Sequence, residues 1–110
     1  MTDNNIKSDY IGHRQRLRER FLLSDGRDMP DYELLELLLT TAIPRRDVKP
    51  IAKNLIRKFG SFARVINAPK EELFEVDGIK DSAYTIFRII VAAIERTLGK
   101  ICVNQNYQFC

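Results

Sequence analysis

The sequence predicts an all-α fold, a compact bundle of about five or six short helices. Apolar residues recur at intervals of three and four along several segments, which is the spacing of one helix face. Glycine and proline residues break the chain between these segments, and the sequence shows no alternating strand pattern. The chain has 110 residues, of which 45% are hydrophobic and 30% charged, so one globular domain with a modest core is expected.

The first two predicted helices differ in their apolar content. The first covers residues 13–23, where Leu17 and Phe21 lie four apart on one face. The second, DYELLELLLTTA, has Asp31 as a candidate N-cap. Its five leucines cover most of the helix circumference, so this helix is expected at the centre of the core.

Three shorter helices are expected to follow. Asp47 is a candidate cap for the first of them, which ends at Gly60. Ser61 caps the second in this prediction, and Pro69 is the first residue of the third.

A last, longer helix is predicted to begin at Asp81 or Ser82 and to end at Gly99. Its apolar residues recur at helical spacing: Ala83, Phe87, Ile90, Ile94 and Leu98. The chain is therefore expected to divide into a flexible N-terminal tail over residues 1–11, a helical domain over residues 12–99 and a C-terminal tail or linker over residues 100–110.

Location signals are few. No apolar stretch is long enough for a transmembrane helix, and the polar N-terminus lacks the apolar region of a secretory signal. Cys102 and Cys110 have neither the number nor the spacing of a disulfide framework or a metal site. A reducing cytoplasm, with no membrane partner, is the expected setting.

The basic residues gather in the first half of the chain, although the net charge is only +3. Arginines of the first helix are Arg14, Arg16, Arg18 and Arg20, and the loop after the second helix carries Arg45 and Arg46. Guanidinium groups neutralise phosphates and release counterions, which makes DNA binding salt-dependent. The alternative is that these arginines form a solvated surface paired with nearby acids.

The stretch EVDGIKDSAYTIF places Gly78 and Ile79 in a turn between two predicted helices. Such a turn leaves the first amides of the next helix without partners at the positive end of its dipole, where an anion binds. Glycine suits it because φ > 0 costs nothing and no Cβ blocks a phosphate. Lys80 and Ser82 complete this candidate DNA contact, and the alternative is a turn that only joins two core helices.

The order of helix, apolar-x-Gly-Ile and helix is similar to the helix-hairpin-helix motif of DNA-binding and repair proteins. More specifically, the chain resembles the N-terminal region of the RadC family. The resemblance lies in HRQRLRERFL, DYELLELLLTTAIPRRDVKPIAKNLIRKFGS and APKEELFEVDGIKDSA, which follow in the family's order. It implies an all-α region with a helix-hairpin-helix motif, and an absent second domain of the metal-binding JAB/MPN type.

The metal chemistry of that second domain is not carried over. Its zinc ligands come from an HxH pair and a downstream aspartate, whereas this chain has a single histidine, His13. We therefore expect no metal and no cofactor. The chain also departs from the hairpin pattern, because Lys80 stands where a second glycine is usual and acids flank the turn: Glu75, Asp77 and Asp81.

Together these features predict a non-catalytic DNA-binding domain that resembles the N-terminal region of RadC-type repair proteins and contacts phosphates without sequence specificity. One alternative is a protein-interaction or regulatory module that docks a partner or a JAB/MPN-type domain. A second alternative is a degenerate glycosylase-like remnant, in which Ser82 stands near the position of the catalytic lysine. Because the chain offers no plausible Ser-His-Asp or Cys-His arrangement, we expect no enzyme activity.

Overall fold

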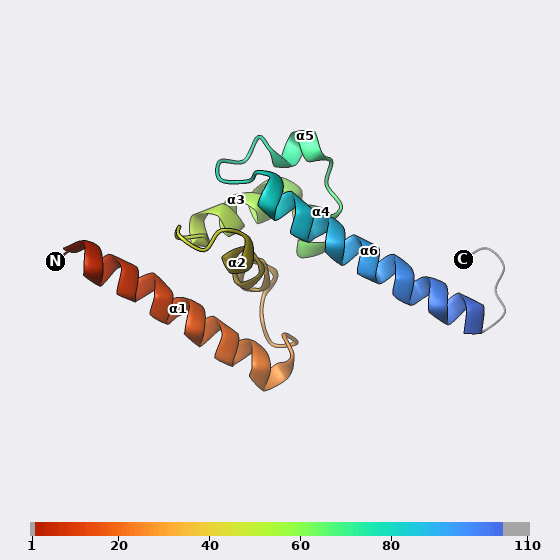
Figure 1. Ribbon diagram of the computed structural model, residues 1–110, viewed down its shortest axis with the longest axis horizontal. Helices are drawn as coiled ribbons and strands as arrows, with labels where there is room; N and C mark the ends of the chain where they lie inside the picture. The colour runs from red at the N-terminus through yellow and green to blue at the C-terminus, as the bar shows by residue number, and fades with distance from the viewer. Residues whose placement is uncertain (1, 105–110) are drawn as a thin grey trace.

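In the computed structural model, residues 2–104 are described, and side chains are described for residues 12–99. Over the described residues the chain forms six helices and no strand (Figure 1). Their bounds are α1 (Thr2–Ser24), α2 (Asp31–Ala42), α3 (Lys49–Phe59), α4 (Phe62–Ile66), α5 (Lys70–Leu73) and α6 (Asp81–Asn104). The prediction of an all-α bundle is confirmed.

Helix α2 is the centre of the bundle and packs against α1, α3, α4 and α6. Leu35 and Leu39 on this helix are fully buried, together with side chains such as Leu55 and Phe87 from α3 and α6. The central position matches the expectation from the leucine run. The run is not buried throughout, however, because three of its leucines are only half-buried: Leu34, Leu37 and Leu38.

Helix capping joins segments that are distant in the chain. Ser61 caps α4 as predicted, because its hydroxyl accepts a hydrogen bond from the Arg64 amide at 3.2 Å. Asp31 does not cap its own helix, since Pro30 occupies the N-cap position of α2. Its carboxylate instead accepts a hydrogen bond from the Phe62 amide of α4 at 2.9 Å. One acid thus begins α2 and satisfies a terminal amide of another helix.

Both end helices are longer than the sequence indicated. Helix α1 begins at Thr2 rather than at residue 13, so the backbone of the expected flexible tail, residues 2–11, is helical. Helix α6 continues to Asn104 and does not end at Gly99. An alanine-like Cβ at Gly99 would meet no atom within 4 Å, and a helix tolerates such a glycine at a cost of about 1 kcal/mol. The three-part division of the chain stays a prediction.

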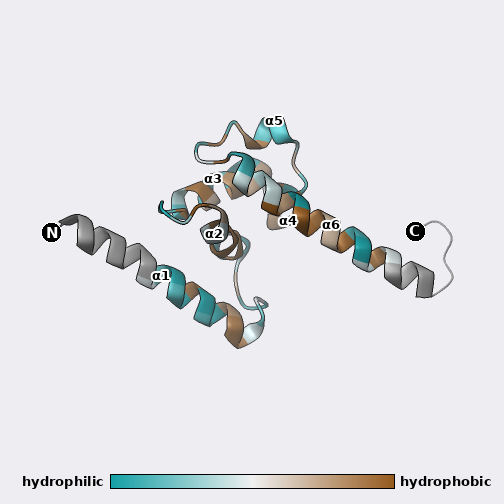
Figure 2. Cartoon of the chain, in the orientation of Figure 1, coloured by the Kyte–Doolittle hydropathy of each residue, from teal (hydrophilic) through white to brown (hydrophobic). Residues whose placement is uncertain are grey.

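The apolar face of helix α6 continues beyond the buried core. Its apolar stripe is buried at Ala83, Phe87 and Val91, but Ile94 and Leu98 on the same face are 52% and 55% exposed. Figure 1 shows the C-terminal half of α6 extending away from the other helices, and Figure 2 shows hydrophobic positions along the coloured part of this helix. In the part of the chain that the structure describes, no helix combines the length and hydrophobicity needed to cross a membrane.

Candidate nucleic-acid interface

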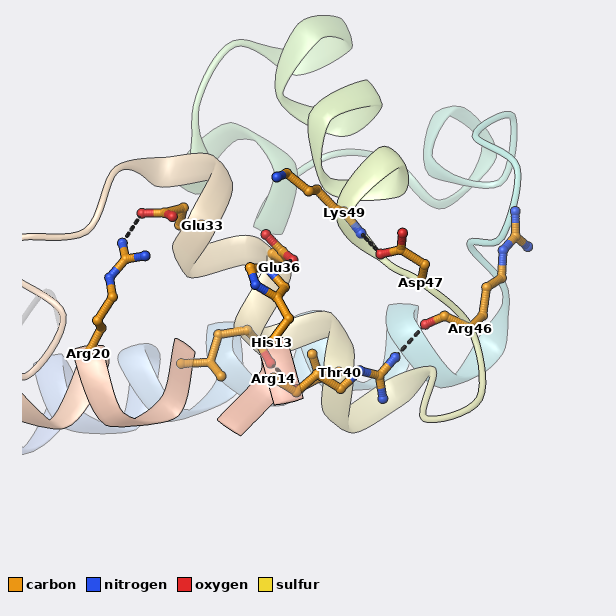
Figure 3. Close-up of polar contacts among 10 residues, drawn as sticks. His13, Arg14, Arg20, Glu33, Glu36, Thr40, Arg46, Asp47 and Lys49 are labelled. Carbon is orange, nitrogen blue, oxygen red and sulfur yellow. Dashed lines mark hydrogen bonds and ion pairs between the residues drawn. The ribbon is translucent and has the colours of Figure 1, made fainter. Parts of the chain in front are cut away.

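Arg14 holds the loop between α2 and α3. Its guanidinium donates hydrogen bonds to the carbonyls of Ile43, at 2.9 Å, and Pro44, at 2.7 Å. Figure 3 shows a further bond from this guanidinium to the carbonyl of Arg46. These carbonyls lie just beyond the C-terminal end of α2, where acceptors lack helical partners and a cation is favoured by the dipole. The geometry therefore gives Arg14 a structural role as the anchor of this loop.

Arg46 in turn holds the loop against the Gly78 turn. Its Nη2 lies 2.6 Å from Oδ2 of Asp77, and its Nη1 would lie 3.1 Å from a Cβ placed on Gly78. The hydrogen bond and the positive charge of Arg46 lower the pKa of the Asp77 carboxyl. Two segments that the sequence singled out separately, the arginine loop and the glycine turn, are therefore adjacent.

Gly78 and Ile79 stabilise the turn through backbone conformation and packing. Gly78 has φ +93°, and a Cβ there would lie 2.6 Å from Cδ1 of Ile51, closer than real Cβ contacts. Ile79 is 2% exposed, and its amide donates to the Val76 carbonyl at 3.1 Å. Glycine is thus required here for its left-handed backbone and for close packing, which favours the structural interpretation of these two residues.

The backbone at Lys80 is unstrained, and two of the three acids that flank the turn are paired with cations. Lys80 does not adopt a positive φ, so it carries none of the strain that a second-glycine position would impose. Glu75 is paired with Lys58, whose Nζ lies 2.5 Å from Oε1 of the carboxylate. With Asp77 also paired, the remaining flanking acid is the exposed Asp81 in the first turn of α6.

The start of α6 offers donors to an anion. The Tyr84 amide donates to the Lys80 carbonyl at 3.1 Å and starts the helical hydrogen-bond series. The amides of residues 81–83 precede it and have no carbonyl within the helix to bond to. The side chains of Lys80 and Ser82 are exposed beside them. This end of α6 is the positive end of a 24-residue helix dipole.

The arginines of α1 do not form one face. Successive residues of an α-helix are about 100° apart, so Arg16 and Arg18 lie about 200° apart, on opposite flanks. Both are exposed, and neither bonds to another described residue. Arg20 forms an ion pair with Glu33 of α2, whose hydrogen bond and charge raise the pKa of the arginine (Figure 3). The arginines predicted to form one basic helix surface therefore lie in different environments.

A buried acid inside the leucine run attaches α1 to α2. Glu36 is 2% exposed, and its Oε2 lies 2.7 Å from Nε2 of His13. Its Oε1 has no hydrogen-bond partner among the described residues. Its only signal in the sequence was its position as a charged residue inside the leucine run. His13, for which no ligand or base role was favoured, thus has a structural one.

Comparison with known proteins assigns the family. Residues 10–85 match the family described as UPF0758 N-terminal. The chain belongs to this family. The match confirms the resemblance to the N-terminal region of RadC-type proteins that the sequence motifs indicated. No solved structure matches the chain.

The UPF0758 relatives are much longer than the matched region. The chain is 50% identical over 84 residues to a UPF0758 protein of Ruegeria pomeroyi, which covers 76% of the chain and 38% of the relative. It is 50% identical over 80 residues to one of Rhodobacter capsulatus, with coverage of 73% and 37%. A Fusobacterium nucleatum relative is 42% identical over 84 residues, covering 76% and 36%. The chain thus spans less than two fifths of these relatives.

In this UPF0758 domain the ten predicted contact residues fall into two groups. Those engaged inside the domain are Arg14, Arg20, Arg46, Gly78 and Ile79. Those with exposed side chains and no bond to another described side chain are Arg16, Arg18, Arg45, Lys80 and Ser82. We define the hairpin–loop surface as Arg45, Arg46, Lys80 and Ser82. The helix-hairpin-helix assignment and the DNA contacts stay predictions.

Metal ligands do not gather in the described part of this UPF0758 domain. Among the side chains of residues 12–99, no group of three or more His, Cys, Asp or Glu residues is arranged to hold a metal ion. The side chains of Cys102 and Cys110 lie outside the described residues.

Proposed function

We propose that this domain binds DNA through its phosphates, without sequence specificity and without a catalytic role. The observation that carries the proposal is the contact of Arg46 with Asp77 and Gly78. It holds the loop that bears Arg45 against the turn that bears Lys80. The hairpin–loop surface therefore combines side-chain cations with the open amides at the start of α6.

The chemistry of this surface suits a phosphodiester. A guanidinium presents paired donors that match phosphate oxygens, and an ammonium adds a point charge. Backbone amides at a helix N-terminus bind the same oxygens. Contacts of these groups to phosphate oxygens carry no sequence information, so the expected binding is independent of sequence. A role in DNA repair belongs to the same proposal and is supported by the RadC resemblance. A cytoplasmic location is proposed from the cysteine pattern of the sequence. A JAB/MPN-type partner domain stays a prediction.

The test is a titration of labelled duplex, nicked and branched DNA, followed by fluorescence anisotropy at about 50 mM and about 200 mM salt. We expect micromolar or weaker binding that falls steeply with salt. In an Arg45→Ala, Lys80→Ala double variant, the slope of log affinity against log salt is expected to decrease by about 2, since each lost phosphate contact removes about one.

A matched control removes two positive charges elsewhere. Arg64 and Arg96 are exposed on α4 and the outer part of α6, and their double alanine variant is expected to keep the salt slope. The absence of binding to every DNA at low salt would overturn the proposal. Loss of binding in an Arg16→Ala, Arg20→Ala variant, with Lys80→Ala unaffected, would move the interface to α1.

A further inference from the structure

One face of the central helix α2 is only partly covered by the rest of the domain. Leu34, Leu37 and Leu38 are half-buried, although Leu35 and Leu39 on the adjacent side of the same helix are fully buried. They line a hollow of about 560 Å³ between α1, α2 and α4. An apolar helix face that remains partly open in an otherwise packed domain marks an interaction surface.

The remaining lining of this hollow is apolar or cationic. Phe21 of α1 and Phe62 of α4 form its sides, and Arg14 and Arg18 stand along α1. The hydroxyls of Thr40 and Thr41 also line it, but they donate to the carbonyls of the preceding turn of α2, at 2.6 and 2.7 Å. Among the described side chains, no carboxylate lines the hollow. A partner therefore needs apolar side chains and a negative charge.

Arg18 is the cation that a partner would meet. Arg14 is already engaged with the loop carbonyls, whereas Arg18 is exposed and bonds to no described residue. The two lie one helical turn apart on the same face of α1. Leu22 is a further turn along and 71% exposed, and it extends the apolar surface beyond Arg18.

We propose that the hollow between α1, α2 and α4 binds an acidic amphipathic segment of a partner protein. Its apolar side chains lie on the three leucines of α2, and a carboxylate pairs with Arg18. Laying the apolar face of a helix into a hydrophobic groove is a general mode of peptide recognition. Charge complementarity selects the acidic partner, because the described lining of the hollow presents guanidinium groups and no carboxylate.

The same lining disfavours nucleic acid at this place. Phosphates are strongly hydrated and require several donors, which an apolar floor of leucine and phenylalanine does not supply. The hairpin–loop surface, by contrast, presents donors. The two proposals therefore concern different residues, and the failure of one leaves the other standing.

The probe is a fluorescein-labelled synthetic peptide with leucines at positions i, i+4 and i+7 and glutamates on the flanks. Two matched peptides replace the glutamates with lysine or the leucines with serine. We expect saturable binding of the acidic peptide only. Arg18→Glu is expected to weaken it by about tenfold or more and to reverse the preference toward the lysine peptide.

Arg16→Glu is the matched control, because it makes the same charge change on the opposite flank of the same helix. It is expected to leave peptide affinity within about twofold, because salt screens the interaction of a peptide with a distant charge. Equal weakening by Arg16→Glu and Arg18→Glu would overturn the site, because it would report net charge alone. If Arg18→Glu weakened DNA binding and left peptide binding unchanged, Arg18 would belong to a nucleic-acid interface and the proposed peptide site would also be overturned.

A measurement on the unsubstituted protein keeps the test independent of variant folding. The leucine methyl resonances of α2 are expected to shift on addition of the acidic peptide, with Leu34, Leu37 and Leu38 most affected. Shifts confined to residues near the Gly78 turn, or no shifts with peptide at roughly 1 mM, would overturn the proposal.

Discussion

The Gly78 turn and helix α1 are joined to the rest of the domain by different kinds of contact. The turn is close-packed, since Gly78 leaves no room for a Cβ against Ile51 and Ile79 is 2% exposed. Among the described side chains of α1, Leu17 alone is fully buried, at 1% exposure. Half-buried Phe21 adds apolar contact, and hydrogen bonds and ion pairs from histidine and arginine tie α1 to α2 and to the loop that follows it.

This difference separates a fixed part of the domain from one that depends on a few charged groups. Close packing acts at short range and is felt when even one methylene is added. Exposed ion pairs are screened by salt, and each contributes little. Substitutions at the turn are therefore expected to destabilise the whole domain, whereas substitutions at the polar contacts of α1 release that helix locally.

The largest effect is expected at the turn, for Gly78→Ala. Left-handed strain costs about 1–2 kcal/mol and overpacking against Ile51 about 1–3, so the free energy of unfolding is expected to fall by roughly 2–5 kcal/mol. Urea denaturation followed by circular dichroism measures it. Gly99→Ala is the control, because its Cβ meets nothing, and it is expected to stabilise by up to about 1 kcal/mol. Equal stability of Gly78→Ala and the parent would refute the role assigned to packing.

The next effect is expected at the buried contact of α1, for His13→Ala. The variant leaves the Glu36 carboxylate, which is 2% exposed, without its hydrogen bond, at a cost of about 1–3 kcal/mol. Adding Glu36→Gln removes the buried charge and is expected to recover part of this loss. Hydrogen exchange at the amides of α1 reports whether the loss is local. Additive effects of the two substitutions would show that the groups are not coupled.

A smaller effect is expected for Arg14→Ala, which removes the donor to the loop after α2. We expect a loss of about 1 kcal/mol, with faster hydrogen exchange in residues 43–48. Arg14→Lys is expected to restore little, because an ammonium lacks the planar fork that spans several carbonyls. The exposed Arg16→Ala serves as the control, with a change within about 0.5 kcal/mol. Unchanged exchange in the loop would contradict the anchoring role.

The smallest effect is expected from the exposed pair of Asp77 and Arg46. Because the folded-state pKa of Asp77 lies below its unfolded value, the pair stabilises fully above about pH 4, and this contribution is lost as pH falls through the folded pKa. The unfolding temperature is therefore expected to fall less between about pH 4 and lower pH in Asp77→Asn than in the parent. Identical acid profiles for the variant and the parent would mean that the pair does not stabilise the fold.

Much of the helical architecture could be predicted from local patterns. Apolar spacing located the helices, and Ser61 followed by a short apolar segment located a cap, because both signals lie within a few residues. Helix ends without a strong signal were misplaced. Gly99 was expected to end α6, yet its backbone does not adopt the left-handed conformation of the other turn glycines.

The assembly of the candidate site could not be predicted in the same way. Neither Arg14 with the loop carbonyls nor Arg46 with the turn leaves a local pattern, because each contact joins residues about thirty positions apart. The half-buried leucines of α2 illustrate the same limit. A helix apolar on most faces is expected in a core, and composition alone does not tell which face its neighbours leave open.

The bond between Asp31 and the amide of Phe62 bears on the order in which the domain folds. Helix α4 has five residues and is too short to be stable alone. Nucleating a helix fixes the backbone of three residues for one hydrogen bond, and so short a helix adds few further bonds to offset that loss of entropy. The Phe62 amide in its first turn donates a hydrogen bond to the Asp31 carboxylate, which lies 31 positions earlier in the chain. That carboxylate reaches its place only when α2 has formed and docked, so α4 is expected to consolidate after α2 on the path to the native state.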